Sequence, residues 1–180
     1  MEFEQVTRRQ SVREGFVVLL RAEATLLLPL GEYDVIRSFY ERIGEACMNW
    51  VTEIYGEELR RHFLSLTEIR EKSRYQTQAY RFWMRSPWEG EGHVTILCES
   101  TRSMLDGTRD FYRICHTWNC KEQSALPPTQ CKRLFDFHAP ASELPFSPDG
   151  FYREGDRMVI YKNANREGHF MEVSFPISNS

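Results

Sequence analysis

Five thiol and imidazole side chains lie close together in the sequence and are of the types that bind zinc: Cys115, His116, Cys120, Cys131 and His138. A zinc site needs four such ligands that converge on one point. Cys115 and His116 are neighbours on an expected strand, so their side chains point to opposite faces. The spacings also match no zinc-finger or zinc-ribbon pattern. We therefore expect buried thiols and an ordinary histidine, with no metal and no cofactor.

Signatures of covalent catalysis and of phosphate binding are missing as well. Because Cys115 and His116 point to opposite faces of the strand, His116 is not placed to act as the general base for the Cys115 thiol. The sequence contains neither a G-x-S-x-G nor a G-x-x-x-x-G-K motif, which argues against a serine hydrolase and a phosphate-binding loop. A small hydrolase or transferase with an active site built from Glu99, Arg113 and His116 stays open as an alternative.

A group of polar side chains shares one parity on three expected strands. The group consists of Trp83 and four charged residues, Arg81, Arg85, Glu99 and Arg113. Cross-strand pairing would gather them on one face of a sheet. Three guanidinium groups against one carboxylate would leave positive charge unmatched, and Arg binds carboxylates and phosphates through paired hydrogen bonds. Two interpretations are open: a site for a small anionic ligand, and a solvated face with exposed ion pairs that contribute little to stability.

The charge of the chain does not indicate a nucleic-acid surface. The formal net charge is -3, and the 23 basic residues are scattered along the chain rather than gathered in a tract. Residues 1–14 are polar and charged, unlike a signal peptide, and the apolar run at 26–30 is far shorter than the roughly 20 residues of a membrane span. Five cysteines without an export signal favour reduced thiols. These features predict a cytoplasmic protein that binds neither nucleic acid nor membrane.

Hydrophobic periodicity predicts one long helix that positions the rest of the fold. Apolar residues recur at intervals of three and four over residues 34–55, and the helix is expected to end near Gly56. Phe39 and Trp50 lie within the apolar arc, so we expect both to be buried. A second helical pattern follows at residues 59–66.

The remaining segments are mostly strand-like. An aliphatic run at 16–28 predicts the first strand, preceded by a polar arm over residues 1–15. Further strands are expected at 75–85, 93–103, 111–119, 151–153, 158–161 and 169–175, with a short helix at 130–137. Short loops, at residues 87–90 and at Asp106-Gly107, favour an antiparallel meander. The pattern predicts a single domain over residues 1–180 of the α+β class, with an antiparallel sheet packed against one long amphipathic helix and short additional helices.

Several phrases between Trp83 and Tyr161 resemble a known family. They are Phe111-Tyr112-Arg113, Thr117-Trp118-Asn119, Leu134-Phe135 and Phe151-Tyr152, followed by Asp156, Val159 and Tyr161. With the amphipathic helix upstream, they resemble a family of bacterial domains of unknown function related to the extracytoplasmic lysozyme-binding domain of an anti-sigma factor. The resemblance implies a helix packed on an antiparallel sheet. We do not expect lysozyme binding to carry over, because residues 1–14 do not resemble a signal or anchor and a family glycine-histidine phrase is replaced by residues 105–108.

The missing catalytic signature and this resemblance to a protein-sensing family point to the same class of function. We expect a non-enzymatic binding or protein-interaction domain. Its partner would be an unknown protein or a small anionic ligand.

Overall fold

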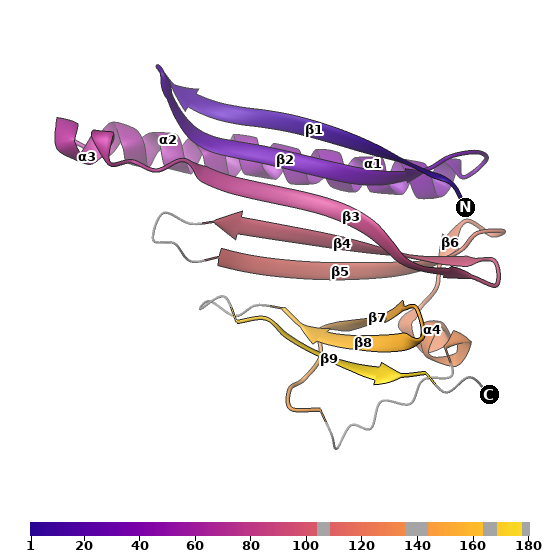
Figure 1. Ribbon diagram of the computed structural model, residues 1–180. Coiled ribbons are helices and arrows are strands. Elements are labelled where there is room, and N and C mark those ends of the chain that lie inside the picture. The colour runs from indigo at the N-terminus through magenta and orange to yellow at the C-terminus, as the bar shows by residue number, and fades with distance from the viewer. Residues whose placement is uncertain (104–108, 136–143, 164–168, 178–180) are drawn as a thin grey trace.

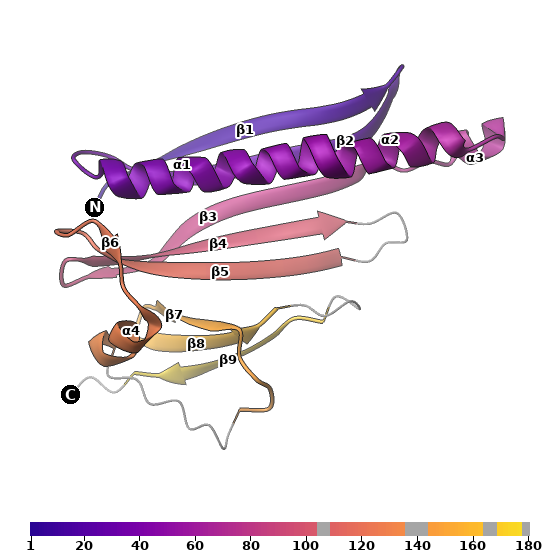
Figure 2. The ribbon, with the colours of Figure 1, turned by 180° about the vertical axis from the view of Figure 1, so that it is seen from behind.

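The computed structural model describes residues 1–103, 109–135, 144–163 and 169–177, apart from the side chain of Lys132. A six-stranded sheet carries a long helix on one face, and a small three-stranded sheet lies against β3, β4 and β5 (Figures 1 and 2). The fold is therefore α+β, as the sequence predicts.

The large sheet has the strand order β1-β2-β3-β4-β5-β6. Its strands are β1 (Phe3–Glu14), β2 (Val17–Pro29), β3 (Gln78–Gly90), β4 (His93–Ser103), β5 (Arg109–Asn119) and β6 (Ser124–Ala125). All neighbours are antiparallel except β2 and β3, which run parallel because the helical segment crosses between them. The expected meander of β3, β4 and β5 is present, while its Asp106-Gly107 turn lies outside the described residues.

The first 15 residues do not form a polar arm, so that expectation was wrong. Residues 3–14 pair with β2 along their whole length, with a register shift after Val12. Val12 is the only buried side chain of β1. An edge strand with so few buried positions lacks the alternation of apolar and polar residues by which strands are recognised, which is why its sequence suggests an arm.

Residues 87–90 were expected to form a loop but belong to β3. A register shift between Arg85 and Trp88 places Pro87 at an irregularity of the ladder, where a proline does not interrupt strand pairing. The chain turns instead at Glu91 and Gly92, both with positive φ, as tight hairpins require.

The helix runs without a break from Asp34 to Ser65. It comprises α1 (Asp34–Asn49), the π-helical turn η1 (Trp50–Tyr55) and α2 (Gly56–Ser65). Gly56 does not end it, because its φ of -64° is that of a helix interior. The glycine instead permits close packing, since a Cβ atom there would lie 2.5 Å from Cγ2 of Val12.

Trp50 is not buried as expected: 43% of its surface is exposed, and Val51 is buried in its place. Trp50 is the first residue of the π-helical turn. A turn closed by i→i+5 hydrogen bonds holds more residues than an α-helical turn, so the buried arc shifts by about one position there. Phe39, in regular α-helix, is half-buried and packs against Tyr40 and Trp118.

The second sheet has the order β7-β8-β9 and is antiparallel. Its strands are β7 (Gly150–Glu154), β8 (Arg157–Lys162) and β9 (Met171–Pro176), and the short helices are α3 (Ile69–Ser73) and α4 (Pro128–Leu134). The expected hairpin and last strand are present.

Hydrophobic residues pack on both faces of the large sheet. On the helix side, alternate residues of β2 from Leu20 to Leu28 pack with Ile36 and Tyr40. On the other side, Leu97 of β4 packs with Tyr152 and other residues of the second sheet. β4 is therefore buried on both faces. Within the described ranges, no helix combines the length and apolar character needed to cross a membrane.

Candidate functional site

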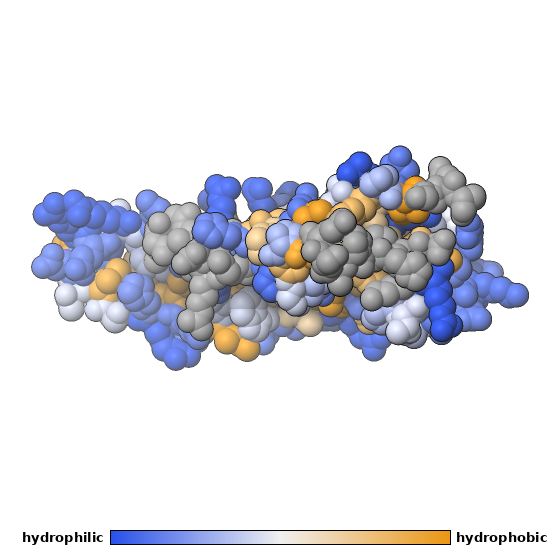
Figure 3. All heavy atoms as spheres, turned by 90° about the horizontal axis from the view of Figure 1, so that it is seen from below, coloured by the Kyte–Doolittle hydropathy of each residue, from blue (hydrophilic) through white to orange (hydrophobic). Residues whose placement is uncertain are grey.

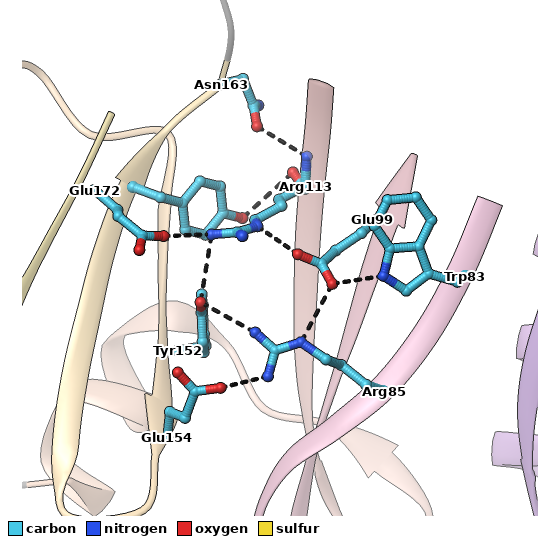
Figure 4. Close-up of polar contacts among 9 residues, drawn as sticks. Trp83, Arg85, Glu99, Arg113, Tyr152, Glu154, Asn163 and Glu172 are labelled. Carbon is cyan, nitrogen blue, oxygen red and sulfur yellow. Dashed lines mark hydrogen bonds and ion pairs between the residues drawn. The ribbon is translucent and has the colours of Figure 1, made fainter. Parts of the chain in front are cut away.

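A network of charged and aromatic side chains joins the two sheets (Figure 4). β3, β4 and β5 contribute Trp83, Arg85, Glu99 and Arg113, and the register places Glu99 beside Trp83 on one side and Arg113 on the other. Four of the five side chains that the sequence places on one parity therefore meet, and Arg81 does not join them. This part of the cluster can be predicted from the sequence, because parity determines the sheet face on which a side chain lies and short turns determine which strands are neighbours.

Glu99 is the centre of this network and is only 4% exposed. Its carboxylate accepts hydrogen bonds from Trp83 Nε1 at 2.8 Å, Arg85 Nε at 3.2 Å and Arg113 Nε at 2.6 Å. A buried carboxylate is tolerated only when paired and hydrogen-bonded. The three donors meet that requirement.

The second sheet supplies partners that the sequence did not predict. Glu154 of β7 pairs with Arg85, and Glu172 of β9 accepts from Arg113 Nη1 at 2.7 Å. The hydroxyl of Tyr152 lies 3.3 Å from Arg85 Nη2 and 3.4 Å from Arg113 Nη1, so it can accept from both. The sequence predicts both strands as elements, but it does not indicate which face of the large sheet their side chains would meet.

Two guanidinium groups therefore face three carboxylates within the network. Burial alone would lower the pKa of Arg113, but the hydrogen bond that it donates to Glu172 and the nearby carboxylates outweigh burial, so the pKa is raised above its usual value. The same balance, with Glu154 as the hydrogen-bonding partner, raises the pKa of Arg85. The surplus of positive charge expected from the sequence is absent at these two arginines, because the second sheet neutralises it.

Arg81 lies on the same face of β3 but outside the network. Its neighbours across the sheet are Glu23 of β2 and Thr101 of β4. Among the described residues, no side chain forms an ion pair or a hydrogen bond with the Arg81 guanidinium group. Its charge nevertheless lowers the pKa of Glu23. Arg81 instead lines a groove on this face of the sheet, together with Glu23 and Thr101.

The three residues of the alternative active site, Glu99, Arg113 and His116, do not lie together. Glu99 and Arg113 face the second sheet, whereas His116 lies on the helix side, with its ring 5.2 Å from that of Phe39. Burial lowers the pKa of His116, which favours the neutral ring. A histidine separated from Glu99 and Arg113 by the thickness of the sheet cannot exchange protons with a substrate held by them.

The thiols are also dispersed. In the parts of the chain that the structure describes, no group of three or more His, Cys, Asp or Glu side chains is placed to hold a metal ion, and His138 lies outside those parts. Burial raises the pKa of Cys115 to about 12 and that of Cys98 further. Both thiols are therefore protonated at neutral pH and unsuited to nucleophilic attack.

An apolar groove lies on the opposite, helix-bearing face of the sheet, and the sequence did not predict it. It has a volume of about 430 Å³ and runs between the helix and β3 to β5. Its walls include Ile43, Cys47 and Trp50 from the helix and Tyr80, Tyr112 and Ile114 from the sheet. Trp50, Tyr112 and Ile114 are 43%, 54% and 40% exposed. Periodicity could not reveal the groove, because it assigns Trp50 to the core.

The surface formed by the second sheet has a different character. Seen from that side, the molecule is hydrophilic toward both ends, and its hydrophobic residues form separate patches in the coloured, described part (Figure 3). The groove between the helix and β5 is instead a continuous hollow with largely apolar walls.

Comparisons with known proteins show the fold. No protein-family model matches the sequence, and no curated protein matches it. Two crystal structures of DUF3298 family proteins are similar. One, from Bacteroides fragilis, has a TM-score of 0.60 at 9% identity and covers 97% of this chain and 90% of its own. The other, from Pseudomonas aeruginosa, has a TM-score of 0.54 at 13% identity and covers 97% and 89%. Neither is described as an anti-sigma factor, so that part of the resemblance is not supported. The chain has a fold similar to that of DUF3298 proteins over nearly its whole length.

Proposed function

We propose that this chain is a non-enzymatic protein-interaction domain that binds an amphipathic helix of a partner protein in the apolar groove. The observation that carries the proposal is the group of half-exposed apolar side chains, Trp50, Tyr112 and Ile114, that line one continuous groove. Exposed apolar surface of this kind marks interaction sites in folded proteins. Aromatic side chains supply much of the binding energy at such sites.

The layer structure favours a helix as the occupant. The long helix packs mainly on β2. A helix is about 10 to 12 Å across and strands are about 4.8 Å apart, so one helix covers about two strands. Phe39 and Tyr40 cover the end of β5 near Trp118, but Tyr112 and Ile114 further along the strand stay open. A second helix beside the first would complete this layer.

The edge of β5 disfavours the other common mode, addition of a strand. At Arg113 the backbone N–H donates to Asn163 Oδ1 at 2.9 Å, and the carbonyl accepts from the Tyr161 hydroxyl at 3.4 Å. The Thr117 carbonyl accepts from Leu126 N at 2.7 Å. A partner strand would have to displace these bonds, whereas a helix would need only the exposed side chains.

The aromatic wall is fixed before binding. The ring of Trp50 stacks on that of Tyr55 at a centroid distance of 6.0 Å and 4°, and meets the ring of Tyr80 edge-on at 5.9 Å. A side chain that is already ordered loses little entropy on binding, so its contacts contribute more fully to affinity. This favours Trp50 as the anchoring residue of the groove.

The charged network supports a binding role rather than catalysis. Glu99, Arg85 and Arg113 bond to one another and to the second sheet. Charged side chains that are paired with one another in this way stabilise the packing between the two sheets. An acid–base catalyst instead needs a titratable group that is free to exchange a proton with its substrate.

A displayed library of amphipathic helical peptides tests the proposal. We expect wild-type protein to enrich peptides that bind with micromolar affinity in fluorescence polarisation. The Tyr112→Lys/Ile114→Lys variant should weaken that binding at least about ten-fold, or about 1.4 kcal/mol. Both residues are about half exposed, so the variant should still fold.

The matched control is Phe16→Lys, which charges an exposed aromatic residue in the turn after β1, remote from the groove. It should bind the selected peptides as wild type does. Failure to enrich any peptide, or equal binding by all three proteins, would refute the proposal.

A further inference from the structure

A second groove lies on the face of the large sheet opposite the helix, beside the inter-sheet network. Its volume is about 380 Å³. The lining residues come from three adjacent strands: Glu23 and Thr25 of β2, Arg81, Phe82 and Trp83 of β3, and Thr101 of β4. Phe82 is buried in the core on the helix side. The groove therefore combines the ring of Trp83 with one acid, one guanidinium group and two hydroxyls.

The two charged groups are available in complementary roles. The hydrogen bond from Arg9 lowers the pKa of Glu23, and the charge of Arg81 adds to this effect. Glu23 is thus an ionised acceptor at neutral pH, held by Arg9 Nε at 2.7 Å. Arg81 offers donors only. Among the described residues, no ion pair or hydrogen bond occupies its guanidinium group.

Trp83 is held in position from outside the groove. Its Nε1 donates to Glu99, as Figure 4 shows, and its ring meets that of Phe111 at a centroid distance of 6.0 Å and an angle of 60°. The polar edge of the indole is therefore satisfied within the protein. What the ring presents to the groove is apolar surface in a fixed orientation.

From this combination we propose that the groove binds a saccharide. A pyranose ring has a face of C–H groups that packs on an aromatic ring, and adjacent hydroxyls that both donate and accept hydrogen bonds. Trp83 supplies the apolar wall, Glu23 accepts from hydroxyls and Arg81 donates to them. The hydroxyls of Thr25 and Thr101 can do either. A few polar groups converging beside an apolar wall are the usual composition of a small-molecule site.

Two simpler ligand classes fit less well. A small inorganic anion would meet Arg81 but would also face the carboxylate of Glu23. A purely apolar ligand would cover both charged groups without giving them partners, which is costly. A polyhydroxylated ring satisfies the acid, the guanidinium group and the aromatic wall together.

A glycan array followed by titration calorimetry tests the inference. The probes for calorimetry are D-glucose, D-galactose, N-acetyl-D-glucosamine, D-glucuronate and the array's best oligosaccharide. We expect saturable binding of at least one pyranose-containing glycan. Binding should weaken at least about ten-fold in Arg81→Gln and in Glu23→Gln, since each removes one half of the polar recognition.

The matched control is Arg21→Gln, which removes an exposed arginine from β2 at the same parity as Glu23 but outside the groove lining. It should leave glycan binding unchanged. No saturable glycan binding, equal losses in all three variants, or a response only to sulfate and acetate would overturn the saccharide site.

This inference does not depend on the helix-binding groove. The two grooves lie on opposite faces of the sheet, so the Tyr112→Lys/Ile114→Lys variant should bind glycans as wild type does. Loss of glycan binding in that variant would contradict separate sites and overturn the assignment.

Discussion

Replacing Glu99 with glutamine should strongly destabilise the protein, because Glu99 is the buried centre of the network between the sheets. Its carboxylate accepts from Trp83, Arg85 and Arg113. Glutamine keeps the size of the side chain but loses the charge. Its amide group would also turn donors toward the two guanidinium groups, where only acceptors fit.

The size of the expected loss of stability depends on the partners that Arg85 and Arg113 keep in the variant. Removing one partner of a buried ion pair costs about 3 to 5 kcal/mol. Arg113 is 12% exposed and keeps Glu172, while Arg85 is 35% exposed and keeps Glu154. These remaining partners and the access of water to Arg85 reduce the loss, so we expect the free energy of unfolding to fall by about 2 to 3 kcal/mol.

Urea denaturation at neutral pH measures this change by linear extrapolation. Glu23→Gln is the matched control, because it makes the same chemical change in an ion pair with Arg9, whose side chain is 75% exposed. The control should lose less than about 0.5 kcal/mol. If Glu99→Gln lost no more than the control, the network would not hold the sheets together and the reasoning would be refuted.

Three further changes have defined outcomes. Gly56→Ala should lower the unfolding free energy by about 1 to 3 kcal/mol, measured in urea, because its Cβ would lie 2.5 Å from Val12 Cγ2. Trp118→Phe removes the 3.0 Å hydrogen bond from Nε1 to the buried Tyr40 hydroxyl and should cost about 1 to 3 kcal/mol; in thermal melts, adding Tyr40→Phe should recover part of the loss, and strict additivity would contradict this account. Burial raises the pKa of Cys115 to about 12, so above about pH 9 the unfolded thiol loses its proton first and stability falls as pH rises. Cys115→Ala should show a shallower fall between about pH 9 and 11 in urea titrations, and an unchanged slope would speak against the shift.

The elements with a strong period could be predicted from the sequence. The long helix and the three-stranded meander follow from spacings of three to four and of two. Parity on adjacent strands then brought Trp83, Glu99 and Arg113 to one face, because a short turn leaves little freedom in which strands are neighbours. The part of the site within the meander was therefore predictable.

The rest depends on packing between distant segments. β1 is an edge strand with a single buried side chain, Val12, so it lacks a period to recognise. The π-helical turn at Trp50 changes which residues face the core without a local signal. Glu154 and Glu172 neutralise Arg85 and Arg113 only because the second sheet packs against that face of the large sheet. The local sequence pattern does not predict where the second sheet packs.

The most direct test of the helix-binding proposal is a methyl NMR titration of the full chain with the tightest peptide from the library selection. We predict saturable shift changes at the methyl groups of Ile43 and Ile114, which line the groove from its two walls. The methyl groups of Leu97 and Val159, buried between the two sheets, should not move. Shifts at Leu97 and Val159 without shifts at Ile43 and Ile114 would contradict the proposal.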